Sequence, residues 1–257
     1  MSFIERALER AARERKKNEA LSAIRPKSPK PSVDFHELDP RIQAMMEDRT
    51  DAFEQYKLLR TMILNASQQN GERLFLVTSA VSGEGKTTTS VNLAISIAQS
   101  LQETALLIDC DLRNPQVHNM LGLERVSFGL ANFLRHEVDL PQVLLKTSIP
   151  KLSLLPAGPP PENPSELINS RTMSLFLEEA KERYQNRLLI IDSPPINQFT
   201  DALILSLKVD GVLLVARAGK TRMNDLEAAV AKLKKANLIG IVLNSTDRLS
   251  SRYYYYY

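Results

Sequence analysis

Short runs of consecutive apolar residues alternate with longer stretches of helical periodicity over most of the chain. The apolar runs lie at residues 74–78, 106–109, 188–192, 212–216 and 239–244. They are continuous and not alternating, which is typical of strands covered on both faces in a parallel sheet. Helical patterns separate them, including residues 87–101, 172–184 and 224–236. This order predicts an α/β fold with a doubly wound, mostly parallel sheet.

Composition divides the chain into four segments. Residues 1–25 open with a Ser-x-x-Glu capping pattern and predict a basic helix, and the proline-rich residues 26–49 predict an extended linker. Residues 50–247 hold the alternating pattern and predict one domain, followed by a tail at 248–257. The apolar stripe of the first helix is thin, so a membrane surface, a partner helix and a solvated arm all stay open as its role.

Overall composition excludes several classes of protein. The chain has 257 residues, of which 43% are hydrophobic and 25% charged, with a formal net charge of +3. Residues 1–30 carry nine Lys or Arg and four Asp or Glu, so the basic excess lies there and does not indicate nucleic-acid binding. The single cysteine, Cys110, excludes a disulfide framework or an all-cysteine metal cluster within one chain. We find no signal peptide or membrane-spanning run, and we expect a cytoplasmic protein.

A phosphate-binding loop lies between the first apolar run and the next helical stretch. Residues 80–88 read Ala-Val-Ser-Gly-Glu-Gly-Lys-Thr-Thr, which fits the Walker A pattern with Ala in its first place. The glycines permit a tight turn whose amides point at a polyphosphate, and the following helix adds its positive end. The nucleotide-binding residues predicted here are Ser82, Gly83, Glu84, Gly85, Lys86, Thr87 and Thr88.

Carboxylates end two of the apolar runs. Asp109 and Asp111 follow residues 106–108, and Asp192 ends the run 188–191 just before two prolines. An ionised carboxylate at the end of an apolar strand is costly unless it is paired or binds a metal ion. Because ligands bind beyond the carboxyl ends of parallel strands, we expect these three groups at one crevice with the loop. Arg113 either belongs to this site or forms a structural salt bridge.

These motifs together resemble the bacterial tyrosine kinases of capsular and exopolysaccharide systems. The resemblance covers roughly residues 50–257 and includes the Asp-Ser-Pro-Pro motif at 192–195, the segments 156–159 and 163–167, and the terminal tyrosine run. Residues 54–61 resemble the oligomerisation helix of the family, with Glu54, Lys57 and Arg60 at its signature positions. Lys57 replaces an arginine and lacks its bidentate fork, which predicts weaker ring assembly. The N-terminal segments resemble the exosortase-associated, stand-alone branch.

The resemblance implies a P-loop NTPase fold like that of MinD and ParA proteins, with ATP and Mg²⁺ as cofactors. It gives Lys86, Asp109, Asp111 and Asp192 catalytic roles and makes Thr87, Asp111 and Asp192 the metal ligands. Asp109 is the expected acceptor of the tyrosine hydroxyl proton, and Asn244 the expected adenine contact.

The resemblance also implies non-specific protein-tyrosine kinase activity with autophosphorylation. The acceptors would be the last five residues, Tyr253, Tyr254, Tyr255, Tyr256 and Tyr257, which are five of the seven tyrosines in the chain. The implied partners are a membrane polysaccharide co-polymerase as activator, further copies of the chain in a homo-oligomer, and a cognate tyrosine phosphatase, without nucleic acid. The protein would associate peripherally with the inner membrane through its partner and regulate exopolysaccharide or capsule synthesis or export.

Two other functions compete with this hypothesis. A switch ATPase of the positioning class usually carries an additional lysine early in the loop, where this chain has Val81 and Ser82. An ATP-binding scaffold of the polysaccharide assembly machine would share the nucleotide site but would transfer no phosphate to tyrosine. Labelling of the tail separates the kinase from both.

Overall fold

The computed structural model describes residues 38–40, 42–43, 51–123, 125–183 and 186–246. The predicted helix at 1–25, most of the predicted linker and the tyrosine tail lie outside the described residues. Within the predicted linker, Ile42 is fully buried, and the Asp39 amide donates a hydrogen bond to the Met120 carbonyl at 3.2 Å. The packed core therefore reaches into the segment ahead of residue 50.

The described chain folds into alternating helices and strands. In order, they are α3 (Asp51–Asn70), β1 (Leu74–Ser79), α4 (Lys86–Ala98), β2 (Thr104–Asp109), α5 (Val117–Met120), α6 (Leu130–Leu134), α7 (Leu140–Val143), β3 (Leu145–Lys146), β4 (Leu152–Leu155), α8 (Pro164–Ile168), α9 (Arg171–Arg183), β5 (Arg187–Asp192), α10 (Asp201–Ser206), β6 (Gly211–Arg217), α11 (Met223–Lys232), the 3₁₀ turn η1 (Leu233–Lys235) and β7 (Leu238–Asn244).

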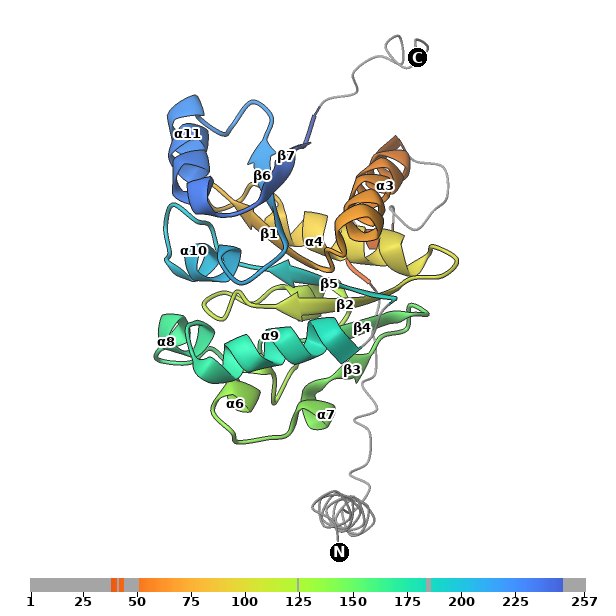
Figure 1. Ribbon diagram of the computed structural model, residues 1–257, viewed down its shortest axis with the longest axis vertical. Coiled ribbons are helices and arrows are strands. Elements are labelled where there is room, and N and C mark those ends of the chain that lie inside the picture. The colour runs from red at the N-terminus through yellow and green to blue at the C-terminus, as the bar shows by residue number, and fades with distance from the viewer. Residues whose placement is uncertain (1–37, 41, 44–50, 124, 184–185, 247–257) are drawn as a thin grey trace, which may run out of the picture. The chain divides into compact units, whose positions relative to one another are not determined.

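The strands form one seven-stranded sheet in the order β3-β4-β2-β5-β1-β6-β7 (Figure 1). All neighbouring pairs are parallel except β3 with β4. The expected mostly parallel, doubly wound sheet is therefore confirmed. Because β2, β5 and β1 are adjacent at its centre, the three segments that carry the predicted site end side by side.

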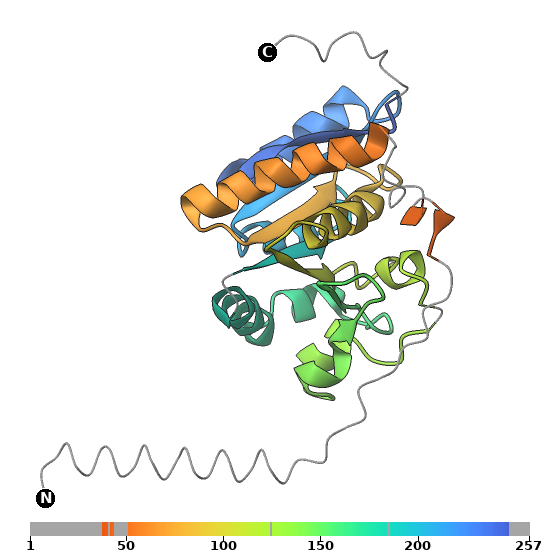
Figure 2. The same ribbon diagram turned by 90° about the vertical axis from the view of Figure 1, so that its right-hand side faces the viewer.

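Helices cover both faces of the sheet. One buried cluster lies under α4, α5 and α3, and the other under α6 and α8 to α11. Figure 2 shows α3 alongside α4 on the same side of the sheet. Strands β1 and β5 are buried almost throughout, which explains their continuous apolar sequences.

The last strand departs from the expected burial. The apolar run at 239–244 predicts a strand covered on both faces, but β7 forms an edge of the sheet, where Ile241 is 49% and Leu243 57% exposed. That expectation is wrong for β7 because a terminal strand has one neighbour and incomplete helix cover. Strands β3 and β4 were not predicted, because they have only two and four residues.

Candidate active site

The loop between β1 and α4 has the backbone geometry of a phosphate cradle. Gly83 and Gly85 adopt left-handed φ angles of 80° and 91°, which L-residues with side chains adopt at a cost. The first i→i−4 bond runs from the Thr89 amide to the Gly85 carbonyl at 2.9 Å. The amides just before Thr89 therefore precede the helical ladder and point toward the helix N-terminus, where an anion is stabilised.

Three segments bring their charged side chains together beside this loop. The Lys86 ammonium donates to Asp111 Oδ2 at 2.8 Å and lies 3.8 Å from Asp192 Oδ2. The Thr87 hydroxyl donates to Asp192 Oδ2 at 2.8 Å, and the Ser90 hydroxyl lies 2.9 Å from Asp192 Oδ1. The structure thus unites the predicted Lys86, Thr87, Asp111 and Asp192 in one cluster.

Asp109 adjoins this cluster but faces inward. It is fully buried and lies opposite Asp192 in the pairing of β2 with β5. Its Oδ1 accepts the Asp111 amide at 3.1 Å and its Oδ2 accepts the Val117 amide at 3.3 Å. Both of its oxygens therefore shape the turn that presents Asp111 to Lys86.

Burial and mutual charge shift the proton affinities of these groups. Burial raises the pKa of Asp109 well above its usual value, and the charges of Asp192 and Asp111 raise it further. Burial also raises the pKa of Asp192, although Lys86 and the hydroxyl donors oppose that rise. For Lys86, burial lowers the pKa, but the surrounding aspartates outweigh it and the pKa is raised. Lys86 therefore stays charged and compensates the buried carboxylates.

The oxygen atoms of the cluster suit magnesium. Mg²⁺ prefers hard oxygen ligands and is usually held by one or two carboxylates together with substrate phosphates. Thr87 Oγ1 and the oxygens of Asp192 and Asp111 already surround a cation, the Lys86 ammonium. Within the described ranges, no three His, Cys, Asp or Glu side chains are arranged to hold a metal ion by themselves. The oxygens of Thr87, Asp111 and Asp192 therefore fit a magnesium ion, which would take further ligands from a bound nucleotide.

Residues distant in sequence also hold the phosphate loop through hydrogen bonds. Ser82 donates to Gln198 at 2.7 Å, between β5 and α10. Asn244 Nδ2 donates to the Glu84 carbonyl at 3.0 Å, and a Cβ on Gly85 would lie 1.9 Å from that nitrogen. Asn244, predicted as an adenine contact, thus packs against the loop backbone, and its contact with adenine stays a prediction.

Sequence reasoning missed several residues that contact this site, among them Ser90 and Gln198. Ser90 lies four residues after Lys86, and that one-turn spacing could have placed its hydroxyl beside the strand end. Gln198 lies in a loop more than a hundred residues from its partner and gives no local signal.

Comparison with known proteins identifies the family. The model of the CobQ/CobB/MinD/ParA nucleotide binding domain matches residues 75–253. The tyrosine-protein kinase YwqD of Bacillus subtilis is 37% identical over 216 residues, which are 83% of this chain and 90% of that protein. The chain belongs to the bacterial tyrosine-protein kinases. The tyrosine-protein kinase CpsD of Streptococcus agalactiae is 33% identical over 202 residues, covering 78% of this chain and 86% of that one.

A solved structure supports the same family. The kinase domain of the Escherichia coli tyrosine kinase ETK is similar with a TM-score of 0.76 at 30% identity, over 90% of each chain. The predicted nucleotide-binding fold and the predicted tyrosine kinase activity are confirmed by these comparisons. They favour the tyrosine kinase over the switch ATPase and the scaffold.

Arg113 of the kinase forms a structural salt bridge next to the site. Its Nε donates to Asp201 Oδ2 at 2.8 Å, and the Asp201 side chain is fully buried. The guanidinium also donates to Ser165 at 2.8 Å and lies 4.5 Å from the centroid of the Phe199 ring. Arg113 therefore ties the turn after β2 to α8 and α10.

The predicted oligomerisation residues of the kinase lie on α3. Lys57 donates to Glu54 at 2.9 Å and stacks over the Phe53 ring at 4.2 Å. Arg60 reaches across to α4, where it donates to the Ser96 carbonyl at 2.7 Å. All three predicted residues are described, and their role between copies stays a prediction.

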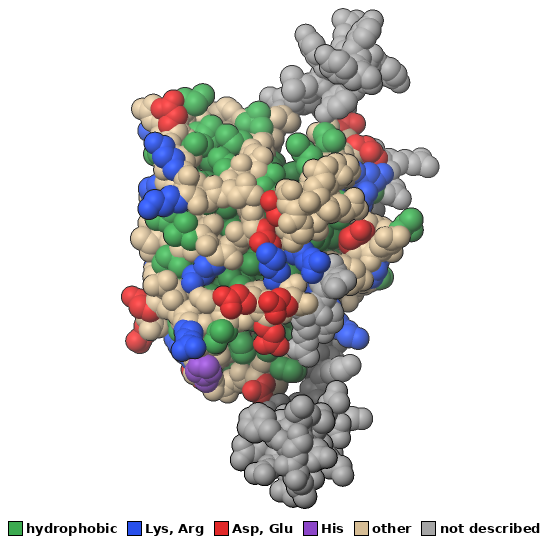
Figure 3. Space-filling view, viewed as in Figure 1, with side chains coloured by type: hydrophobic (Ala, Val, Ile, Leu, Met, Phe, Trp, Pro, Cys, Tyr) green, Lys and Arg blue, Asp and Glu red, His purple; other side chains and the backbone are tan. Residues whose placement is uncertain are grey.

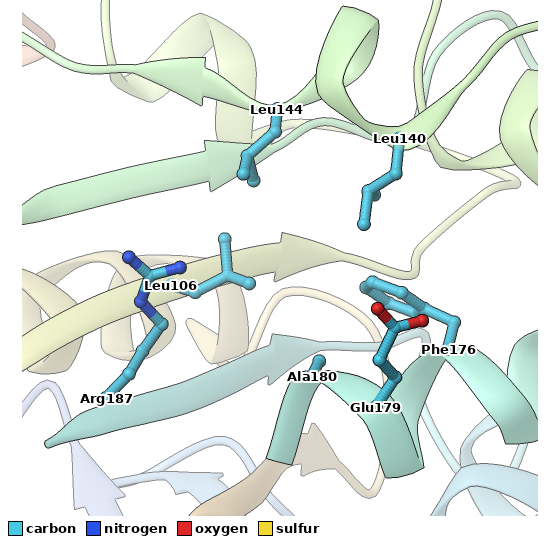
Figure 4. Close-up of a pocket in the computed structure, with 7 residues that line it drawn as sticks. All are labelled: Leu106, Leu140, Leu144, Phe176, Glu179, Ala180 and Arg187. Atoms are coloured by element: carbon cyan, nitrogen blue, oxygen red, sulfur yellow. The ribbon is translucent and has the colours of Figure 1, made fainter. Parts of the chain in front are cut away.

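Further surface features of the kinase lie outside this cluster. A small pocket between β2, α7 and α9 has Leu140 facing Phe176, and the charged residues Arg187 and Glu179 also line it (Figure 4). On the face in Figure 3, basic and acidic side chains are interspersed. No helix in the described part of the chain is long and apolar enough to cross a membrane.

Proposed function

We propose that this tyrosine kinase transfers the γ-phosphoryl group of ATP to its own terminal tyrosines, Tyr253 to Tyr257. The observation that carries the proposal is the Lys86 cluster, in which one ammonium, one hydroxyl and two carboxylates converge beside the phosphate loop. The chain beyond β7 carries the five consecutive tyrosines. From Asn244 to Tyr257 is 13 residues, which extend to at most about 45 Å.

The residues have distinct chemical tasks in this proposal. Lys86 neutralises the β- and γ-phosphates, and Thr87, Asp192 and Asp111 hold Mg²⁺ directly or through water. Bound Mg²⁺ supplies neutralisation of the developing phosphate charge. The chain's contribution is to position these largely buried groups before ATP arrives.

A carboxylate must also accept the phenol proton, because free tyrosine titrates near pH 10. Asp109 is proposed for this role, and its raised pKa is the direction that favours a base. Asp111 is the second candidate, because it contacts Lys86 while both oxygens of Asp109 accept amides. Asp109→Asn and Asp111→Asn, each assayed for Mg-ATP binding and tyrosine labelling, assign the role. If Asp109 is the base, Asp109→Asn should lose about 10²- to 10⁴-fold in transfer while it still binds Mg-ATP, whereas Asp111→Asn, which also removes a proposed Mg²⁺ ligand, should weaken Mg-ATP binding as well.

We further propose that the kinase regulates exopolysaccharide or capsule synthesis or export. In this proposal it works as a homo-oligomer, with a membrane co-polymerase as activator and a tyrosine phosphatase as its opponent. The activator would hold it at the cytoplasmic face of the inner membrane. Each phosphate adds about −1.5 to −2 charges, and the resulting repulsion between tails would open the oligomer.

Solution mass tests that switch. The oligomer formed by the phosphorylated protein should have a smaller mass in solution than the oligomer of the variant with Tyr253 to Tyr257 replaced by Phe. Equal masses would contradict the switch and leave the transfer reaction untouched.

A further inference from the structure

One buried side chain of the phosphate loop has no task in the proposed reaction. Glu84 lies between the two loop glycines, and only 2% of it is exposed. A carboxylate so near a triphosphate site opposes phosphate binding through Coulomb repulsion. Glu84 therefore needs a contribution that outweighs its charge.

The contacts of Glu84 close the loop on itself and fasten it to a distant turn. Its Oε2 accepts the Val81 amide at 2.9 Å, three residues earlier in the loop. Its Oε1 accepts the hydroxyl of Thr221, which lies in the turn between β6 and α11. The Thr221 oxygen in turn accepts the Arg217 amide at 2.7 Å. Both carboxylate oxygens are thus occupied by donors.

The same turn also holds the loop backbone. Arg217 Nη1 donates to the Gly83 carbonyl at 3.2 Å, and Asn244 at the end of β7 donates to the Glu84 carbonyl. The Ala218 amide joins the turn to β7 by donating to the Asn244 carbonyl at 2.9 Å. The connection from β6 to α11 and the end of β7 lie at the same end of the sheet (Figure 1). Two neighbouring loop residues are therefore fixed from one side by this assembly.

We propose that Glu84 and Thr221 are positioning residues that fix the shape of the phosphate loop before the nucleotide binds. A loop with two left-handed glycines has many conformations, and fixing one of them lowers the entropy lost on binding. The hydrogen bonds of Glu84, not its charge, carry this effect. The inference concerns nucleotide binding and does not depend on tyrosine transfer.

Four variants separate the hydrogen bonds from the charge. Glu84→Gln keeps an oxygen for the Val81 amide, and its amide can donate to the Thr221 oxygen, which has a second lone pair. Glu84→Ala removes both contacts. Thr221→Val removes the hydroxyl at nearly constant volume, and Thr221→Ser restores it. Thr61→Val is the matched control, since that hydroxyl donates to the Lys57 carbonyl on exposed α3.

The experiment measures the Kd of Mg-ATP by calorimetry and amide exchange in nucleotide-free protein. Glu84→Ala and Thr221→Val should each weaken Mg-ATP binding by at least about 3- to 10-fold, because that factor corresponds to one net hydrogen bond and each variant loses two. Glu84→Gln, Thr221→Ser and Thr61→Val should stay within about twofold of the wild type. The Val81 amide should exchange faster in Glu84→Ala but not in Glu84→Gln.

Two results would overturn the proposal. If Glu84→Ala binds Mg-ATP as tightly as the wild type or more tightly, charge repulsion dominates and the hydrogen bonds do not matter. If Glu84→Gln is as weak as Glu84→Ala, the carboxylate charge is what the site needs. Should Glu84→Ala fail to fold, the comparison of Thr221→Val with Thr221→Ser decides. Equal Kd values for Mg-ATP and equal amide exchange in these two variants would overturn the proposal.

Discussion

Replacing Lys86 with methionine should destabilise the kinase in a pH-dependent manner. The Lys86 ammonium compensates Asp111 at 2.8 Å and the fully buried Asp192 at 3.8 Å, with buried Asp109 adjacent. Removing one partner of a buried ion pair costs about 3–5 kcal/mol when the other charge stays. For a domain near this size, that corresponds to a drop in Tm of roughly 6–20 °C.

The sign of the pH dependence follows from the carboxylates. Burial raises the folded-state pKa of Asp109 and Asp192 above the unfolded value, so the folded protein binds their protons more tightly. Their contribution to stability is fully present below the unfolded pKa near 3.9 and is lost as the pH rises through the folded pKa. Without the ammonium of Lys86 these pKa values rise further. The variant should therefore lose stability relative to wild type as the pH rises from about 4 to 8.

Urea unfolding of nucleotide-free protein at pH 5 and pH 8 tests this reasoning. The stability gap between wild type and Lys86→Met should be larger at pH 8. Lys86→Arg keeps the charge and should show a smaller gap with little pH dependence, and Lys86→Met with Asp192→Asn should recover part of the loss. A Lys86→Met protein as stable as wild type at both pH values would refute the compensating role of Lys86.

Three further predictions follow from contacts around the site. Gly85→Ala should lower the free energy of unfolding by about 1–2 kcal/mol from the left-handed φ of residue 85 alone. Adding Asn244→Ala should remove the clash between the new Cβ and the Asn244 side chain but not the backbone strain, as a double-mutant cycle in urea would show. Arg113→Lys should lower unfolding stability by about 1–3 kcal/mol, because the fork on buried Asp201 is lost; an unchanged urea midpoint would contradict the bridge. Arg60→Ala should lower the free energy of unfolding by about 0.5–1.5 kcal/mol, because its hydrogen bond to α4 is lost. Lys57→Ala should lower it by only about 0.2–0.5 kcal/mol. Equal losses for the two variants in urea unfolding would contradict that ranking.

The sequence was sufficient to predict the centre of the fold. Strands β1, β2, β5 and β6 are buried on both faces, so their sequences are continuous apolar runs that cannot be mistaken for half-exposed strands. The loop could be predicted equally well, because glycines, a lysine and a threonine occupy fixed places between a strand and a helix. The convergence of Asp111 and Asp192 on Lys86 followed from the rule that parallel strands end at one edge.

Other features depend on contacts that local sequence does not encode. The exposure of Ile241 and Leu243 depends on β7 having no further strand beside it, which an apolar run does not reveal. The contact between Glu84 and Thr221 joins residues 137 positions apart. The inward orientation of Asp109 depends on the turn to Val117, because alternation along a strand alone predicts that Asp109 and Asp111 share one side.

The most direct test of the central claim is Mg-ATP labelling of the purified full chain, with and without the cytoplasmic segment of the candidate co-polymerase, followed by peptide mapping. The account predicts phosphate on the peptide that contains Tyr253 to Tyr257 and its loss when those five residues are replaced by Phe. ATP hydrolysis without tyrosine labelling, even with the activator present, would contradict it.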